Sequence, residues 1–207
     1  MRKRVNQLRT NDPTGMRNRV LDVAAGAFQA AGYGATSMHD ITRQAAVSGG
    51  ALYHHFPSKK ALALAVISER VAAEVAETWI QAVREAPSAA AGILAVFGRT
   101  IAQLDAAGAV GGCPLNNLAL ELSLADEDFR GAIAAEYDAW RQALAERLRQ
   151  DAAAGHAPFA AQDPEGFATV VVAMFSGAMA IAKAEQRSSA LRACADQLAI
   201  MMSGPGG

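Results

Sequence analysis

The stretch from Thr36 to Lys60 constrains the fold of this chain more than any other segment does. It carries the signals of two short helices, a tight turn and the start of a third helix. Ser37, followed three residues later by Asp40, is typical of a capped helix start, and Ser48 precedes a second run with apolar residues four positions apart. Two short helices joined by a turn of three or four residues are typical of a helix-turn-helix that binds the major groove of DNA.

The same segment resembles a known family. From Gly32 to Lys60 the pairs Gly-Tyr, Thr-Ser, Asp-Ile and Val-Ser, then Ala-Leu-Tyr-His-His-Phe and Ser-Lys-Lys, follow one another in the order seen in the N-terminal domain of TetR-family transcriptional regulators. The resemblance covers about residues 14 to 70. It implies a DNA-binding head on a helical body that binds a ligand and forms a homodimer.

Composition independently predicts an all-α chain of about nine helices. Strand patterns are nearly absent, and a hydrophobic content of 52% is ample for a core. We expect a basic disordered arm over residues 1–12, a helix-turn-helix DNA-binding domain over 13–60 and a helical ligand-binding and dimerisation domain over 61–207. The helices are expected at residues 13–31, within 37–56, and at 59–84, 89–107, 115–124, 127–154, 164–186 and 189–202.

Charge divides the chain in the same way. Residues 1–60 carry nine lysines and arginines against three aspartates, a formal charge of +6. Residues 61–207 carry ten basic against seventeen acidic residues, a formal charge of −7, so the overall −1 conceals the contrast. A basic head on an acidic body favours a sequence-specific DNA-binding protein over an architectural protein that coats DNA.

The chain is expected to act in the cytoplasm. Its basic N-terminus is not followed by an apolar signal-peptide core. The segment from Gly166 to Ala182 has seventeen residues without a charge, close to the lower limit of a membrane span, but its many small residues favour a buried helix and no membrane partner. Two cysteines form neither a disulfide framework nor a zinc site, so we expect no metal and no cofactor.

The candidate DNA contacts lie in and around the second short helix. The resemblance implies that Tyr53 contacts phosphate, that His54 contacts a base or phosphate, and that Lys59 contacts phosphate at the start of the next helix. Hydroxyl groups and helix N-termini bind phosphate oxygens, while basic side chains contact base edges or neutralise charge. The full candidate set comprises Ser37, His39, Arg43, Ser48, Gly49, Gly50, Tyr53, His54 and Lys59.

The turn between the two short helices departs from the family pattern. Ala46 occupies a position that is usually glycine in the family. If the turn requires a positive φ, alanine there costs about 1 kcal/mol. Gly49, where relatives often carry a long side chain, leaves few side chains to contact bases.

The last two helices are the candidate dimer interface. A single recognition helix does not by itself give tight, selective binding, so a two-fold dimer on a palindromic site is expected. Small residues in both helices allow close approach, and a four-helix bundle across the two-fold axis would follow. The residues predicted to fill it are Met174, Phe175, Met179, Leu191, Leu198 and Met201.

The effector site is expected among the middle helices, where large apolar side chains combine with a few polar groups. A second distinctive stretch, Gly111 to Glu121, resembles a segment with Gly-Cys followed by Asn-Leu-Ala that occurs in one branch of the family. Its Cys113 precedes a helix whose first turn offers free N–H groups, a setting that lowers a thiol pKa, so Cys113 is expected either as a reactive thiol or as a small buried thiol packed against Pro114. The candidate ligand-binding residues are Trp79, Phe97, Leu104, Cys113, Asn116, Asn117, Phe129, Tyr137 and Trp140.

These features predict a ligand-responsive transcriptional regulator, a repressor by family habit, whose partners are operator DNA, a second copy of the chain and a small molecule. The alternative is a redox or electrophile sensor of the same fold that acts through Cys113. An enzyme is not expected, because no catalytic motif surrounds either the cysteines or the histidines and no catalytic residue is proposed. The effector and the operator sequence are not encoded in any motif of the chain.

Overall fold

The computed structural model describes residues 12–155 and 163–203, and within them the chain forms nine helices and no β-strand. The predicted all-α fold is confirmed. The arm predicted for residues 1–12 lies almost wholly outside the described residues. The helices are α1 (Pro13–Ala31), α2 (Met38–Gln44), α3 (Gly49–His55), a long helix over residues 59–85, α7 (Ala89–Ala107), α8 (Pro114–Leu122), α9 (Glu127–Ala153), α10 (Pro164–Glu185) and α11 (Ser189–Ser203).

Short polar side chains start the helices of the N-terminal half. Asp12 accepts a hydrogen bond from the N–H of Gly15, and Pro13 occupies the first helical position of α1. The side chains of Ser37, Ser48 and Ser58 each accept from the backbone N–H three residues further on. These caps satisfy N–H groups that have no partner inside the helix, so the sequence prediction of the helix starts is confirmed.

The long helix joins the head to the body without a break, but it is not a uniform α-helix. It consists of α4 (Lys59–Val66), the π-helical segment η1 (Ile67–Val71), α5 (Ala72–Val75), the π-helical segment η2 (Ala76–Gln81) and α6 (Ala82–Glu85). The two π-helical segments were not predicted, because apolar periodicity does not distinguish an occasional i→i+5 turn from an α-helical one. Such segments occur frequently at functional sites.

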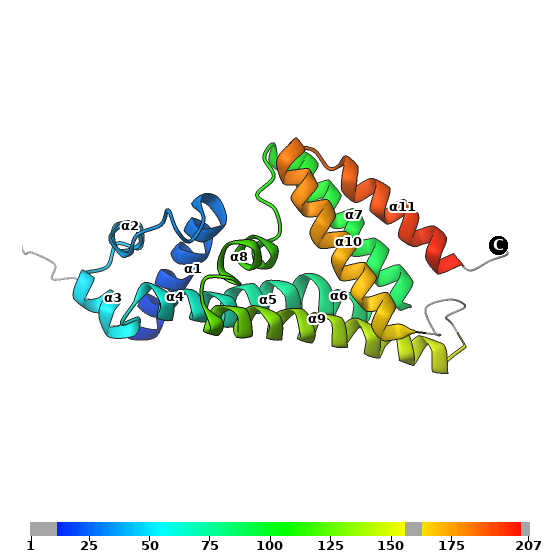
Figure 1. The fold of residues 1–207 in the computed structure, drawn as a ribbon, viewed down its shortest axis with the longest axis horizontal. Helices are drawn as coiled ribbons and strands as arrows, with labels where there is room; N and C mark the ends of the chain where they lie inside the picture. The colour runs from blue at the N-terminus through cyan, green and yellow to red at the C-terminus, as the bar shows by residue number, and fades with distance from the viewer. Residues whose placement is uncertain (1–11, 156–162, 204–207) are drawn as a thin grey trace, which may run out of the picture.

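The molecule is elongated, with α1, α2 and α3 at one end and α7, α10 and α11 at the other (Figure 1). The helix α9 runs beside the long helix in the same direction, from the head to the far end, and contacts α4, both π-helical segments and α6. The helix α8 lies between the head and the far bundle, and it contacts α1, η1 and α9. A change inside the body therefore has direct routes to the head through the long helix, through α8 and through the start of α9.

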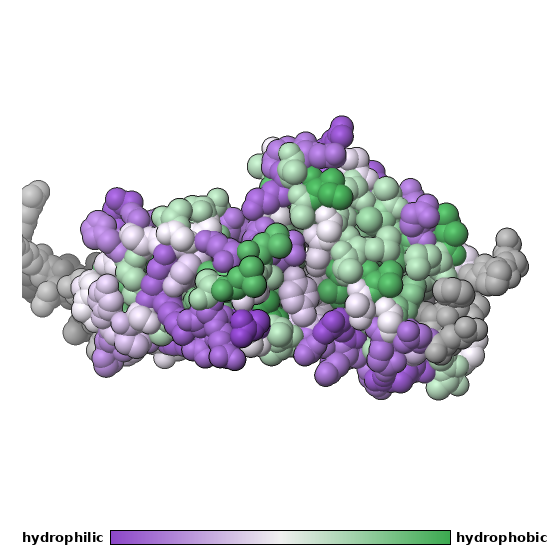
Figure 2. Space-filling model, in the orientation of Figure 1, coloured by the Kyte–Doolittle hydropathy of each residue, from purple (hydrophilic) through white to green (hydrophobic). Residues whose placement is uncertain are grey.

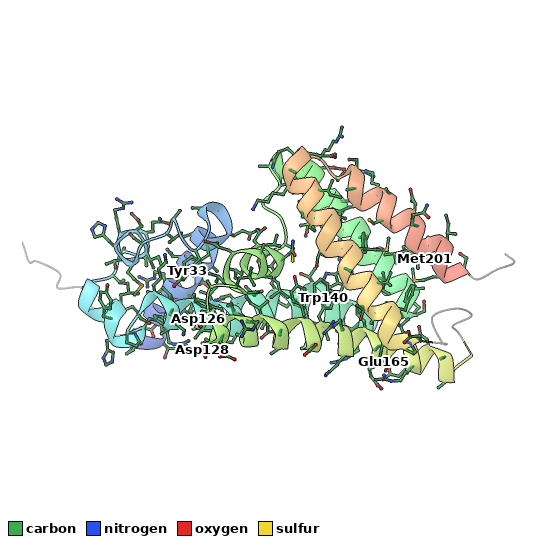
Figure 3. All side chains as sticks on the ribbon, in the orientation of Figure 1. Tyr33, Asp126, Asp128, Trp140, Glu165 and Met201 are labelled. Carbon is green, nitrogen blue, oxygen red and sulfur yellow. The ribbon has the colours of Figure 1, made fainter. Side chains whose placement is uncertain are left out.

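An aromatic cluster forms the centre of the body. Trp79 of η2, Phe97 of α7, Trp140 of α9 and Phe175 of α10 are all buried, and their ring centroids lie 4.8–5.9 Å apart. Four helices thus meet through edge-to-face and tilted aromatic contacts, which stabilise a core beyond the area they bury. Figure 3 shows Trp140 in this interior position.

The side chains predicted for the dimer interface mostly point into the monomer. Phe175, Met179, Leu191 and Leu198 are buried within one chain, so they present no surface to a partner. Met174 and Met201 are partly buried and pack against the same core. The prediction was wrong for the four buried residues, because the helices α10 and α11 use their larger side chains to pack on α7 and α9 and leave smaller ones outside.

The apolar helix considered as a possible membrane span is α10. It is long and hydrophobic enough to cross a bilayer, with a mean hydropathy of 1.8 over its most apolar window, but half of that window is buried inside the protein. It makes extensive contacts with α9 and α11. This burial identifies α10 as a core helix, as its small residues predicted.

Candidate functional site

The turn between α2 and α3 has the strained conformation that its sequence predicted. Ala46 has a φ of 52°, in the left-handed region that favours glycine. Its N–H donates to the carbonyl of Arg43, and the N–H of Val47 donates to the carbonyl of Thr42. These two hydrogen bonds form a Schellman motif, which requires a left-handed residue at the position of Ala46.

The helix α3 presents an exposed face suited to close contact with a duplex. Gly49 and Gly50 form its first turn, and a Cβ atom added at either would meet nothing within 4 Å. Tyr53 is 53% exposed, an unusual state for a large aromatic side chain, and His54 is also exposed. Leu52 and the cap residue Phe56 are buried on the opposite side and anchor α3 to the head.

Most of the remaining candidate DNA contacts have partners within the protein. Ser37 and Ser48 act as helix caps, and Arg43 is exposed and forms an ion pair with Asp40 at 2.9 Å. His39 is exposed. The ammonium of Lys59 lies 4.1 Å from the centroid of the Tyr33 ring, and burial lowers its pKa. Lys59 must therefore leave this ring if it is to neutralise a phosphate.

The junction between head and body is held by charged and aromatic contacts. Lys60 of α4 forms ion pairs of 2.7 Å with Asp126 and Asp128 at the start of α9, and hydrogen bonds to these carboxylates raise the pKa of Lys60 to about 12. Figure 3 shows Tyr33 and the two aspartates at this junction. Tyr33 packs on Phe129, with ring centroids 5.4 Å apart. Phe129 was predicted to bind ligand, and its ring lies at the head–body junction, outside the lining of the cavity described below.

A second set of hydrogen bonds ties α1 to the loop before α8. The side-chain amide of Gln29 donates to the carbonyls of Gly111, at 3.0 Å, and Gly112, at 2.8 Å. Asn117 donates to the Gln29 side chain and to the Gly111 carbonyl, both at 2.9 Å, and accepts from Lys183 of α10 at 3.3 Å. We call Gln29, Gly111, Gly112, Asn117 and Lys183 the glutamine network. Asn117 therefore belongs to this network, and it does not line the cavity described below.

A further carboxylate of α8 holds the turn after α1. Glu121 accepts hydrogen bonds from the backbone N–H groups of Tyr33, at 2.8 Å, and Gly34, at 2.6 Å. Bonds between a carboxylate and two adjacent N–H groups are among the stronger hydrogen bonds in proteins. The helix α8 is thus hydrogen-bonded to the head at two positions, through Asn117 and through Glu121.

A cavity of about 230 Å³ lies in the body between the long helix, α7, α8 and α10. Four of the predicted ligand-binding residues line it, namely Trp79, Leu104, Cys113 and Trp140. The other lining residues were not in the predicted set: Val71, Glu74, Val75, Thr78, Thr100, Gln103, Gly112, Pro114, Leu115, Phe175 and Met179. Phe175 and Met179, predicted for the dimer interface, contribute here to the cavity wall.

Three further predicted ligand residues lie close to the cavity without lining it. Phe97 packs behind Trp79 in the aromatic cluster. The ring of Tyr137 stacks on Trp140 with centroids 6.5 Å apart, and its hydroxyl donates to Asn116 at 3.4 Å. Burial raises the pKa of Tyr137 to about 12, so its hydroxyl stays protonated at neutral pH. These residues support the cavity wall from behind.

Some polar groups of the aromatic cluster have no hydrogen-bond partner among the described residues. They are the indole N–H groups of Trp79 and Trp140 and the hydroxyl of Ser176. Unpaired buried polar groups are uncommon in folded proteins, and each calls for an explanation. Here two of the three lie on residues that line the cavity, which fits a region that receives a polar group from a ligand or solvent.

The environment of Cys113 differs from the one its sequence position predicted. Cys113 does precede α8, but it is buried, with 7% of its surface exposed. Burial raises the pKa of its thiol to about 11, and nearby backbone N–H groups offset this only in part. The expected lowering of the pKa was wrong, because removal from water disfavours the thiolate more than the helix N-terminus favours it.

Glu74 is the charged residue of the cavity wall, and the sequence analysis did not identify it. It lies in α5, the four-residue α-helical segment between η1 and η2. The side chain is exposed to solvent at the edge of the cavity, and partial desolvation by the surrounding protein raises the pKa of its carboxyl. Glu74 is one of four glutamates on the long helix, and no sequence signal distinguishes it from the others.

Two family models match the chain in adjacent regions. Residues 20–66 match the model for bacterial regulatory proteins of the TetR family, and residues 89–197, more than half of the chain, match the C-terminal domain of LmrA/YxaF-like transcriptional regulators. The first region contains the helix-turn-helix, and the second contains α7 to most of α11, including the stretch from Gly111 to Glu121. Both halves of the molecule are therefore similar to regulators of one kind.

Individual relatives extend the similarity over most of the chain. The transcriptional regulator YxaF of Bacillus subtilis is 25% identical over 187 residues, 90% of this chain and 94% of its own length. The regulator LmrA of the same organism is 28% identical over 176 residues, 84% of this chain and 90% of its own. Among solved structures, a TetR transcriptional regulator from Chloroflexus aurantiacus superposes with a TM-score of 0.80 at 28% identity, covering 92% of this chain and 96% of that one.

Proposed function

The chain belongs to the TetR family of transcriptional regulators, and from that premise we propose that it is a repressor that binds a palindromic operator as a homodimer and is released by a small molecule. The observation that carries the proposal is the combination of an exposed α3 face with a cavity in the body that hydrogen bonds connect to α1. Its place of action is the cytoplasm, where the DNA of a bacterial regulator lies.

The DNA-binding role rests on what α3 leaves uncovered. An exposed tyrosine and histidine follow two glycines whose Cα atoms have open space beside them, so backbone and side chains can both reach a duplex. Tyrosine hydroxyls and helix N-terminal N–H groups bind phosphate, and histidine can donate to a base edge or to phosphate. The formal charge of +6 in residues 1–60 supplies the attraction to the polyanion.

The test is selection of bound sequences from random duplex DNA with the purified chain, followed by binding of the best site by the double variant Tyr53→Ala/His54→Ala. We expect a palindrome with half-sites about one helical turn apart, or a multiple of it, because the site must match a two-fold dimer. The double variant should lose at least about a hundredfold in affinity, since each lost contact of this type costs about 1–3 kcal/mol. Gel-shift or fluorescence anisotropy at fixed salt measures the change.

The matched control is Leu124→Ala, which truncates a side chain that is 99% exposed on the body. It should bind the selected site like the wild type. Circular dichroism of the double variant should match the wild type, because both truncated side chains are exposed. Retention of wild-type affinity by a folded double variant would exclude α3 as the recognition helix.

The homodimer is supported by the outward side of α10. Thr169, Ala173, Gly177 and Ile181 follow one another at four-residue spacing and are all exposed. Val170 on the same helix and Ile200 on α11 add exposed apolar surface. Figure 2 shows hydrophobic residues gathered over this end of the molecule, where α10 lies in front. A stripe of small and apolar side chains allows the close approach of a second helix.

Effector release is supported by a residue that belongs to both the cavity and the glutamine network. Gly112 lines the cavity, has a φ of 83°, and accepts a hydrogen bond from Gln29 of α1 through its carbonyl. A ligand that displaces this loop would break or strain the bonds to α1. Because α1 packs on α3 and α4, a shift of α1 would also shift α3, the proposed recognition helix. Ligand binding would then stabilise the head position that does not fit the operator, and this shift of population would release the DNA.

Sensing of oxidants or electrophiles through Cys113 has weaker physical support. A thiol with a pKa near 11 is almost fully protonated at neutral pH, and the thiolate is the reactive species. The position of Cys113 in the cavity wall gives it instead a role as a small apolar contact for the ligand.

A further inference from the structure

We propose that the effector is a lipophilic cation, an apolar molecule with one protonated amine, whose ammonium group pairs with Glu74 at the mouth of the cavity. The inference rests on the proposed effector role of this cavity and specifies the chemistry of its ligand. It follows from three properties of the site: its size, the apolar character of its walls, and the sign of the charge at its entrance.

The size and walls of the cavity define the body of the ligand. A cavity of about 230 Å³ exceeds the 150 Å³ that holds benzene in an engineered protein core, so it accommodates roughly ten to twelve non-hydrogen atoms. Most of its wall is aliphatic or aromatic, contributed by valines and leucines, both tryptophans, Phe175 and Met179. A ligand of this size that fills the space gains most of its affinity from apolar contact.

The charge at the entrance defines the head group. Glu74 is the charged residue among those that line this cavity, and neither a lysine nor an arginine lines it. It also lines an adjoining cavity of about 200 Å³, so its carboxylate stands where the two spaces meet. Within the described residues no hydrogen bond or ion pair reaches that carboxylate, whereas Arg70, one turn earlier and also at the second cavity, donates to Asp22 and Asn18.

An unpaired carboxylate beside apolar surface favours a cation over other head groups. Partial desolvation raises the pKa of the Glu74 carboxyl, and a ligand ammonium would favour its charged form through a charge-assisted hydrogen bond. A ligand carboxylate would place a second negative charge next to Glu74. A ligand hydroxyl could donate a hydrogen bond to Glu74, but it would carry no positive charge to pair with the carboxylate. The remaining polar residues of the wall, Thr78, Thr100 and Gln103, are uncharged and discriminate little between these head groups.

The test compares three probes that each carry a phenyl ring on a four-carbon chain, namely 4-phenylbutylamine, 4-phenylbutan-1-ol and 4-phenylbutanoate. Tryptophan fluorescence of the full chain reports their binding, because both tryptophans of the chain line the cavity. We expect the wild type to bind the amine most tightly and the carboxylate least. In Glu74→Gln, which keeps the shape and removes the charge, amine affinity should fall about tenfold or more and alcohol affinity should change less than about twofold.

The matched control is Glu77→Gln. Glu77 lies three residues later on the same long helix, in η2, but lines a different surface cavity. This variant should retain the wild-type order and affinities. Equal binding of amine and alcohol by the wild type, no detectable binding of the amine, or an unchanged preference in Glu74→Gln would each overturn the proposal.

The same measurements separate this proposal from the proposed function. If the amine binds through Glu74 but does not weaken binding to the selected operator, the ligand chemistry holds and the effector role of the cavity fails. If DNA selection yields no preferred sequence, the regulatory function fails while the charge preference of the cavity stands. If the operator is released by other compounds while the three probes bind without regard to charge, the lipophilic-cation proposal alone is wrong.

Discussion

At the scale of single residues, Ala46 determines the conformation of the turn between α2 and α3. Ala46 completes the Schellman motif at the end of α2 although its left-handed φ of 52° is unfavourable for any residue with a Cβ atom. The motif persists because its hydrogen bonds and the caps of α2 and α3 fix the chain on both sides. The helix-turn-helix therefore tolerates a local strain in the loop that orients its recognition helix.

We expect Ala46→Gly to raise the free energy of unfolding by about 0.5–1 kcal/mol. Glycine avoids the steric cost of the left-handed conformation, which favours the folded state by about 1–2 kcal/mol. Glycine also gives the unfolded chain more conformational entropy, which offsets part of this stabilisation. The Ala46 side chain is exposed, so its removal loses no packing. Urea denaturation at fixed protein concentration measures the difference. As a control, Ala135→Gly, at an exposed position inside α9, should lower stability by about 1 kcal/mol. A loss of stability in Ala46→Gly would show that the turn is not strained.

Elements of the body are joined by one buried ion pair at the far end of the long helix. Arg147 of α9 forms an ion pair with Asp151 at 2.9 Å and donates to the carbonyls of Arg84, in the last turn of α6, and of Ala86, which follows α6. Asp151 in turn accepts from the backbone N–H of Ala89 at the start of α7. One pair of side chains thus satisfies the end of one helix and the beginning of the next, where no backbone partner exists.

Arg147→Ala should lower the free energy of unfolding by about 3 kcal/mol. The two side chains are only 15% and 8% exposed, so removal of the cation leaves a buried carboxylate without its partner. Thermal or urea denaturation followed by circular dichroism measures the loss. Arg141→Ala serves as the control, because its pair with Asp138 is exposed and its loss should change stability by less than about 1 kcal/mol. Equal, small effects of both substitutions would contradict a structural role for the Arg147–Asp151 pair.

The whole molecule is a basic head attached to an acidic body by a continuous apolar core and by a set of polar contacts. Lys60 with Asp126 and Asp128, Glu121 with the turn after α1, and the glutamine network form the polar part of this attachment. Polar contacts of this kind are exchanged at lower cost than a packed apolar interface, which suits a joint that takes two positions. The helix α10, whose outward side is the proposed site for a second copy of the chain, lies in the bundle at the end remote from the head (Figure 1).

Gly177→Arg should convert the dimer into a monomer. A Cβ atom added at Gly177 meets nothing within 4 Å in one chain, so the substitution changes the outer surface of α10 without disturbing the monomer. A long charged side chain in the middle of the small-residue stripe would keep a second helix away. Sedimentation or light scattering at micromolar concentration measures the mass.

Gly131→Arg provides the control for this experiment, because Gly131 lies on α9 with equally open space beside it. It should remain a dimer and bind operator normally. A dimeric Gly177→Arg variant would place the interface elsewhere. Monomeric Gly177→Arg should also bind the palindrome far more weakly, because only one half-site is then engaged at a time.

The sequence alone determined the helices and the recognition segment, because these depend on local signals. Serine caps, Pro13 at the start of α1, Gly32 after its end and the apolar repeats are short-range features, and the structure places the helix boundaries within a few residues of their predictions. The strained turn at Ala46 was also predictable, since backbone conformation at one position follows from residue type and motif. The DNA-contacting roles of α3 remain predictions that its exposed face supports.

Only the tertiary structure decided which face of each helix is inside. Phe175 and Met179 suit a dimer interface and a cavity wall equally well by composition, and packing against α7 and α9 places them in the body. For Cys113 the sequence left open a reactive thiol or a small buried one, and the fold buries it and raises its pKa, because burial depends on residues that are distant in sequence. The place of Glu74 in the cavity wall and the hydrogen bonds of Gln29 also depend on contacts between residues that are distant in sequence. A long-range contact leaves no periodic signal in the chain, so the cavity, its charge and its connection to the head depend on the fold.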